Sequence, residues 1–142
     1  MIMKTVTFGE MASLFENLKD GPEKKEIAVT FDIQVSILES WLRSISFVRN
    51  ACAHHYRLWN RKLPIKPIVP VRKNNRFLVN IDDDTNKCRL YGILSCMLYI
   101  IKVISPKTKF NQRIKALFAE FPGVNIRYMV FPDNWHEENL WK

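Results

Sequence analysis

The chain has 142 residues, of which 47% are hydrophobic and 12% aromatic, and its formal net charge is +8. This length and composition suit a single domain over residues 1–142 and exclude a disordered tail. The longest uncharged, mostly apolar run is Leu90–Ile101, which is shorter than the roughly 18 residues that a membrane span needs. Three cysteines without C-x-x-C spacing are typical of reduced thiols, so we expect a cytoplasmic protein with no membrane contact.

The positive charge is concentrated in the middle of the chain. Residues 1–39 hold 4 basic and 7 acidic residues, whereas residues 40–81 hold 9 basic residues and no acidic one. Residues 120–142 are again net acidic. A basic middle between acidic ends is typical of a protein that binds a polyanion, although an ordinary solvated surface would give the same count.

Hydrophobic spacing predicts a mostly helical domain. Apolar residues recur at three- and four-residue steps from Phe8 to Leu18, which predicts an amphipathic helix. The Asp20-Gly21-Pro22 stretch then breaks the pattern, and Pro22 suits the first position of a short helix over about Glu23–Val29.

The strongest pattern predicts one long helix over Ile33–Arg61, with Asp32 as its N-cap. The stretch contains neither glycine nor proline, which argues against a break. Its apolar residues follow steps of three and four along one face: Ile33, Ile37, Trp41, Ile45, Val48, Cys52, Tyr56 and Trp59.

Proline at every third position predicts an extended segment over Leu63–Val71. Several candidate N-caps then occur in Asp82–Asn86. The pattern beyond the prolines predicts a short strand, two helices and an aromatic tail that packs on the body: Arg76–Ile81, Lys87–Ile104, Lys109–Phe121 and Val124–Lys142.

A second, polar stripe follows the predicted long helix. Asn50, His54, Arg57 and Arg61 are spaced by four, three and four residues, and Arg49 lies on the neighbouring side. No carboxylate occurs within this run. The helix would therefore present an amide, an imidazole and several guanidinium groups together.

This grouping suits chemistry on a phosphodiester. Imidazole titrates near neutral pH and can move a proton to or from a 2′-hydroxyl or a leaving 5′-oxygen. Guanidinium donates a planar fork of hydrogen bonds to phosphate oxygens. A structural histidine on a basic surface would give the same spacing, so spacing by itself leaves both interpretations open.

No metal and no cofactor is predicted. Cys52 falls on the apolar stripe, and the directions of His54 and His55 differ by about 100°, so these three do not share a centre. Glycine-rich nucleotide-binding motifs and the G-x-S-x-G elbow are absent from the sequence.

The segment Val48–Arg61, with the sequence VRNACAHHYRLWNR, resembles the signature of the Abi-like abortive infection proteins of bacteria, which belong to the HEPN superfamily of helical ribonuclease domains. The superfamily motif is Arg, a polar residue, three variable residues and His, and it corresponds to Arg49, Asn50 and His54. Three further stretches resemble the family: Thr7-Phe8-Gly9, Ser40-Trp41-Leu42 and Phe131-Pro132-Asp133-Asn134-Trp135. The chain resembles the C-terminal half of these longer proteins.

The resemblance implies a mainly α fold, namely a HEPN-like helical bundle with an irregular Pro-rich loop and an aromatic C-terminal tail. It also implies metal-independent RNA cleavage, in which the 2′-hydroxyl attacks the adjacent phosphate at a composite site of a homodimer. Each protomer would supply Arg49 and His54 as catalytic residues, with Asn50 orienting one of them. The residues expected to bind RNA are His55, Arg57, Arg61 and Lys62.

The implied setting is phage defence or a toxin–antitoxin system, with RNA and an antitoxin as expected partners. The adjacent histidines leave open whether His54 or His55 acts, although the superfamily spacing favours His54. The alternative is a non-catalytic RNA- or protein-binding module of an abortive infection system.

Overall fold

The computed structural model describes residues 6–70 and 88–142. The helices of these residues are α1 (Phe8–Asn17), α2 (Pro22–Thr30), α3 (Val35–Ala53), α5 (Leu90–Ile104), α6 (Phe110–Glu120) and the short 3-10 helices η2 (Ile126–Met129) and η3 (Trp135–Glu137). No strand occurs in the described part of the chain, so the mainly α fold is confirmed. The predicted strand Arg76–Ile81 and the N-cap candidates Asp82–Asn86 lie outside the described residues.

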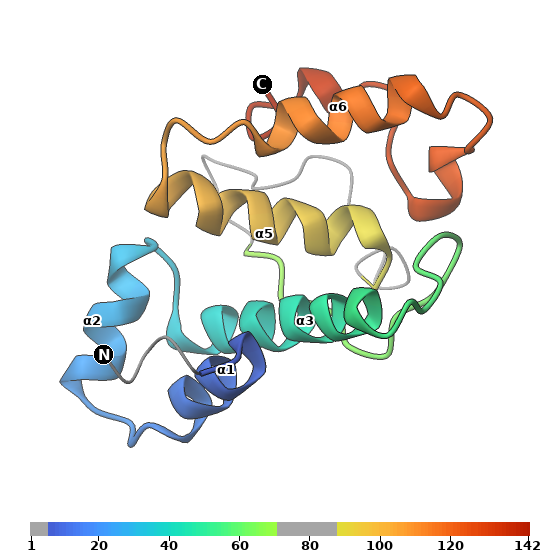
Figure 1. The fold of residues 1–142 in the computed structure, drawn as a ribbon. Helices are drawn as coiled ribbons and strands as arrows, with labels where there is room; N and C mark the ends of the chain where they lie inside the picture. The colour runs from blue at the N-terminus through green and yellow to red at the C-terminus, as the bar shows by residue number, and fades with distance from the viewer. Residues whose placement is uncertain (1–5, 71–87) are drawn as a thin grey trace.

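Helix α5 is the centre of the molecule. Figure 1 shows α5 between α3 on one side and α6 on the other, with α1 and α2 lying against α3. One stripe of α5 packs toward α1, α2 and α3: Ile93, Cys96 and Ile100. Another stripe packs toward α6 and the C-terminal segment: Tyr91, Leu94 and Leu98. A helix that is apolar nearly all round is suited to such a position, because both of its sides are removed from water.

The apolar face of α3 builds the first core. Ile37, Trp41, Ile45 and Val48 are buried, as the helical spacing predicts. The indole Nε1 of Trp41 donates a hydrogen bond of 2.8 Å to the carbonyl of Ile68. This bond fastens the Pro-rich segment to α3, and residues 63–70 of that segment form neither helix nor strand.

Helix α1 begins at the capping box of Thr7 and Glu10, in which each side chain bonds the backbone N–H of the other residue. The helix itself is confirmed, but of its apolar stripe Phe15 alone is buried. The rest of the stripe is exposed to solvent: Phe8, Met11, Leu14 and Leu18. Because burying such side chains is favourable, this surface is suited to contact with another apolar surface.

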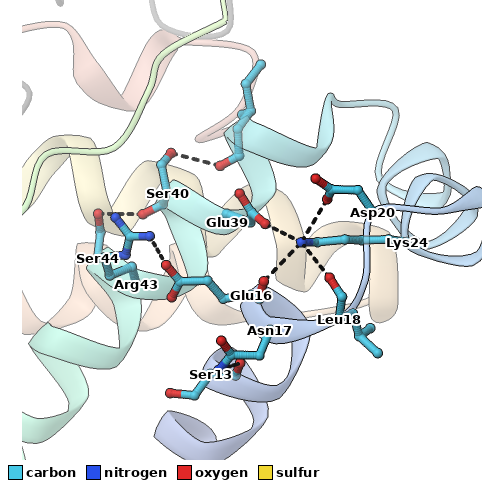
Figure 2. A network of polar contacts seen from close by, with 11 residues as sticks. Ser13, Glu16, Asn17, Leu18, Asp20, Lys24, Glu39, Ser40, Arg43 and Ser44 are labelled. Carbon is cyan, nitrogen blue, oxygen red and sulfur yellow. Dashed lines mark hydrogen bonds and ion pairs between the residues drawn. The ribbon is translucent and has the colours of Figure 1, made fainter.

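A buried lysine, which the charge pattern does not predict, joins α1, α2 and α3. Lys24 is 4% exposed, and its Nζ lies 2.6 Å from an oxygen of Glu39 and 3.3 Å from one of Asp20. Figure 2 shows the same ammonium group directed at backbone carbonyls near the end of α1, those of Glu16 at 3.0 Å and Leu18 at 3.2 Å. Glu39 raises the pKa of Lys24 above its ordinary value, since the carboxylate favours the charged form. The ammonium thus satisfies carbonyls at the end of α1 and binds α2 to α3.

The aromatic tail packs on the body, as predicted. Trp141 is fully buried, and its indole Nε1 donates a hydrogen bond of 3.0 Å to the hydroxyl of Ser95 on α5. Tyr91 donates a 2.7 Å hydrogen bond to Glu138 of the tail, and burial raises the pKa of the Tyr91 phenol. The side-chain amide of Asn111 on α6 donates to the carbonyl of Lys142 at 2.6 Å. These bonds fix the C-terminal segment against α5 and α6.

Candidate functional site: the C-terminal end of α3

Helix α3 ends at Ala53, so the prediction of a helix through Arg61 is wrong. His55 adopts a left-handed conformation with φ of 55°. The N–H of His55 donates to the carbonyl of Cys52 at 3.1 Å, and the N–H of Tyr56 donates to that of Ala51 at 2.8 Å. These two bonds form a Schellman motif, which ends helices most often at glycine. Histidine is one of the few other residues that are enriched in this conformation, so the chain turns without glycine or proline.

The beginning of α3 also differs from the prediction. Its N-cap is Gln34 and not Asp32, whose backbone is left-handed with φ of 52°. Asp32 therefore belongs to the turn that separates α2 from α3.

The early end of α3 changes how the predicted polar stripe is arranged. Arg49 and Asn50 lie on the last turns of the helix, and His54 is its C-cap. Arg57 and Arg61 lie in the loop beyond it, so the four-residue spacing that places them on one helix face does not apply. The structure therefore places Arg49 and Asn50 on α3, His54 at its C-cap, and the two arginines in the loop that follows.

The predicted apolar stripe is also wrong from Cys52 onward. Cys52 is exposed and Ala51 is buried in its place. Tyr56 is 61% exposed and Trp59 is 36% exposed, because both follow the end of the helix.

The loop after α3 is held in place by contacts with distant parts of the chain. Trp59 donates from its indole Nε1 to the carbonyl of Asn125 at 3.3 Å. The N–H of Leu63 donates to the carbonyl of Cys88 at 2.8 Å, and Leu63 itself is buried. Asn60 is left-handed with φ of 51°. The loop therefore has a defined shape although its polar side chains face water.

The catalytic candidates are solvent-exposed and lie in a positive environment. Arg49 donates from Nη1 to the amide oxygen of Asn50 at 3.0 Å. The remaining candidates are His54, His55, Arg57, Arg61 and Lys62, of which Arg61 is half-buried and the others are exposed. No ion pair joins any of these cationic side chains to a carboxylate of residues 6–70 or 88–142.

A hollow of about 210 Å³ between α1 and α3 reaches Asn50. Gly9 lies on its wall, where a Cβ atom would come within 3.3 Å of the Ser46 hydroxyl. Glycine therefore lets the first turn of α1 approach the second half of α3. Cavities of about 690 and 480 Å³ lie instead near the beginning of α3, around Gln34, and contain none of the predicted site residues.

Sequence reasoning missed three exposed aromatic residues beside the basic side chains. The Tyr56 ring centre lies 5.8 Å from that of His54. The Trp59 ring packs edge-to-face on Tyr128, with ring centres 5.3 Å apart. Tyr128 belongs to η2 and is 50% exposed. The helical spacing predicted that Tyr56 and Trp59 lie on the buried face. The one local signal for the end of the helix was His55, because histidine tolerates the left-handed backbone conformation better than most residues.

Across residues 6–70 and 88–142, no three His, Cys, Asp or Glu side chains lie together as metal ligands. No helix in this part of the chain is long and apolar enough to cross a membrane.

Comparison with known proteins supports the resemblance. The family model of Abi-like proteins matches residues 1–60, a range that contains α1, α2, α3 and the catalytic candidates. The match covers less than half of the chain, because residues 61–142 lie outside it. No curated protein and no solved structure matches the chain. The Abi-like resemblance is therefore confirmed over residues 1–60, and the HEPN relationship stays a prediction.

Proposed function

We propose that this protein is a metal-independent endoribonuclease of an abortive infection system, acting in phage defence or as a toxin. The observation that carries the proposal is the exposed group of Arg49, Asn50 and His54 at the end of α3. The group lies in the segment that matches the Abi-like family and has no described carboxylate paired with its cations. The match to the Abi-like family, which is named for abortive infection, is the reason to expect a role in phage defence.

The proposed reaction uses the RNA's own 2′-hydroxyl as the nucleophile. One His54 imidazole takes the proton of this hydroxyl while the 2′-oxygen forms a bond to phosphorus. The bond from phosphorus to the 5′-oxygen breaks, and a second, protonated His54 gives its proton to that oxygen. The products are a 2′,3′-cyclic phosphate and a free 5′-hydroxyl.

Arg49 binds the phosphate oxygens in this proposal and stabilises the charge that develops on them. Asn50 is the orienting residue, since its amide oxygen already accepts a hydrogen bond from Arg49. His55, Arg57, Arg61 and Lys62 would contact the RNA backbone around the cleaved bond.

The proposed reaction uses two His54 side chains, one as base and one as acid, and each protomer has one, so the active form is proposed to be a homodimer. The exposed apolar stripe of α1 is the surface that we assign to this contact. This stripe lies on α1, and the first turn of α1 approaches α3 at the hollow that also contains Asn50. A two-fold contact through the stripe would therefore place the catalytic candidates of both protomers near one interface.

The test is cleavage of single-stranded and structured RNA by the purified chain in EDTA. His54→Ala and Arg49→Ala are expected to lower the rate by at least about 100-fold, the usual range for lost proton transfer. His136→Ala and Arg113→Ala are matched controls at exposed positions elsewhere and are expected to cleave normally. The products should carry cyclic phosphate ends.

Equal cleavage by the wild type and His54→Ala would refute the assignment, as would loss of wild-type cleavage in EDTA. Binding of RNA without any cleavage would instead favour the non-catalytic module. The dimer is tested by light scattering, in which Leu14→Lys should give a monomer and Leu117→Lys, at an exposed leucine of α6, should not. A wild-type monomer that cleaves RNA would refute the composite site.

A further inference from the structure

We infer that Tyr56, Trp59 and Tyr128 form a stacking surface for unpaired RNA bases beside the cationic loop. We call these three residues the aromatic platform. The inference rests on the proposed action on RNA and adds the class of substrate, namely RNA that is single-stranded where it is bound.

The first observation is that these rings stay in water although the molecule has two aromatic-rich cores. Trp41, Trp135 and Trp141 are buried, whereas Tyr56, Trp59 and Tyr128 are 61%, 36% and 50% exposed. Exposed aromatic faces are the feature on which proteins stack single-stranded bases.

The second observation is the geometry of the pair that closes the platform. Trp59 and Tyr128 are far apart in the sequence, yet their ring centres lie 5.3 Å apart in an edge-to-face arrangement with an interplanar angle of 83°. In this arrangement, the ring that presents its edge keeps both of its faces clear of the other ring. One ring of the pair therefore keeps both faces free of its partner, and both rings are partly exposed.

The third observation is the charge of the loop that carries two of the three rings. Arg57, Arg61 and Lys62 lie on the same loop as Tyr56 and Trp59, and residues 40–81 contain no acidic residue. Proteins bind single-stranded nucleic acid by combining cations that contact the phosphates with aromatic rings that stack on the bases.

The platform is also fixed before any ligand binds. The Schellman motif at His55, the Trp59–Asn125 hydrogen bond and the Leu63–Cys88 hydrogen bond hold both ends of the loop. A surface that is already ordered loses little conformational entropy on binding, so the contacts it makes contribute more fully to affinity.

A purely structural explanation accounts for only part of the platform. Trp59 and Tyr128 fasten the loop to η2, so their packing has a structural role. Tyr56 has no such fastening role among the described ring contacts. Its ring lies against His54 and stays mostly exposed. Tyr56 is therefore the residue on which the inference is tested.

The experiment measures the binding of 2′-O-methyl oligonucleotides, which lack the attacking hydroxyl and cannot be cleaved by the proposed reaction. A single strand and a blunt duplex of the same length are compared by fluorescence anisotropy with the full chain. The wild type is expected to prefer the single strand. Tyr56→Ala should weaken single-strand binding by about 5- to 100-fold, the range for one stacked base, and should leave duplex binding unchanged.

Three further variants make the result specific. Tyr56→Phe keeps the ring and should restore the affinity, and Tyr128→Ala should weaken it in the same way as Tyr56→Ala. Phe121→Ala removes a ring that is 52% exposed at the end of α6 and should have no effect.

Wild-type affinity in Tyr56→Ala, or equal wild-type affinity for the two oligonucleotides, would overturn the inference. If unmodified RNA is nevertheless cleaved in a His54-dependent way, the proposed function survives and only the platform fails. If the single strand binds as expected and unmodified RNA is not cleaved, the platform is supported and the ribonuclease fails. Binding of neither oligonucleotide would overturn the platform and point to a protein partner.

Discussion

The left-handed residue that ends α3 leads to a prediction that joins stability to function. His55 has φ of 55° and is exposed, so glycine in its place would remove strain and no buried contact. Glycine adopts this conformation without a steric penalty, whereas valine, which is branched at Cβ, is poorly tolerated there. We expect His55→Gly to be more stable than the wild type and His55→Val to be less stable.

The size of the effect follows from two opposing contributions. A left-handed conformation costs an ordinary L-residue about 1–2 kcal/mol, and histidine tolerates it better than most. Glycine removes that cost but loses more backbone entropy on folding, about 0.5–1 kcal/mol. The net gain expected for His55→Gly is therefore about 0.5 kcal/mol, with a loss of about 1 kcal/mol or more for His55→Val.

The assay is urea and thermal unfolding followed by circular dichroism. For a chain of this length, 1 kcal/mol corresponds to a change in Tm of about 3–4 °C. His55→Gly also separates the adjacent histidines: at saturating RNA it should keep His54-dependent cleavage, because the Schellman motif that positions His54 is preserved, while loss of the backbone contact assigned to His55 should weaken RNA binding. Lower stability in His55→Gly than in His55→Val would refute the account of the helix end, and loss of cleavage at saturating RNA with an intact fold would assign the proton transfer to His55.

Two further predictions concern buried groups. Lys24→Met is expected to lower Tm near neutral pH, since Glu39 and the carbonyls at the end of α1 lose their donor. Because the folded-state pKa of Lys24 is raised, its contribution is fully present below its ordinary pKa of 10.5 and is lost as pH rises through the higher folded value. The Tm difference should therefore shrink above that pH in scans from neutral to alkaline conditions, and a constant difference would contradict the role assigned to its charge. A thiol reagent such as Ellman's should label Cys52 rapidly in the native protein, whereas Cys88 and Cys96 are buried and should react only after unfolding. Burial also raises the pKa of the Cys96 thiol, which further slows its reaction with the reagent, because the thiolate is the reactive form. Rapid labelling of all three cysteines in native buffer would show that the cores are open.

Much of the helical framework follows from the order of residues along the chain. Thr7 and Glu10 cap α1, Pro22 begins α2, and the apolar steps from Ile37 to Val48 define the buried face of α3. These features depend on interactions within a turn or two of helix, and such interactions can be read from spacing. The position of Arg49 and Asn50 on α3 follows for the same reason.

The shape of the surface beyond the end of α3 is set by contacts between distant segments. The pattern of steps continued through Trp59, but Trp59 packs on Tyr128 and bonds the carbonyl of Asn125. Lys24 likewise has a partner from another helix, because α3 places Glu39 next to it. Spacing along a chain carries no information about which remote partner a side chain meets, and so the aromatic platform and the buried lysine emerged only when the helices were packed together.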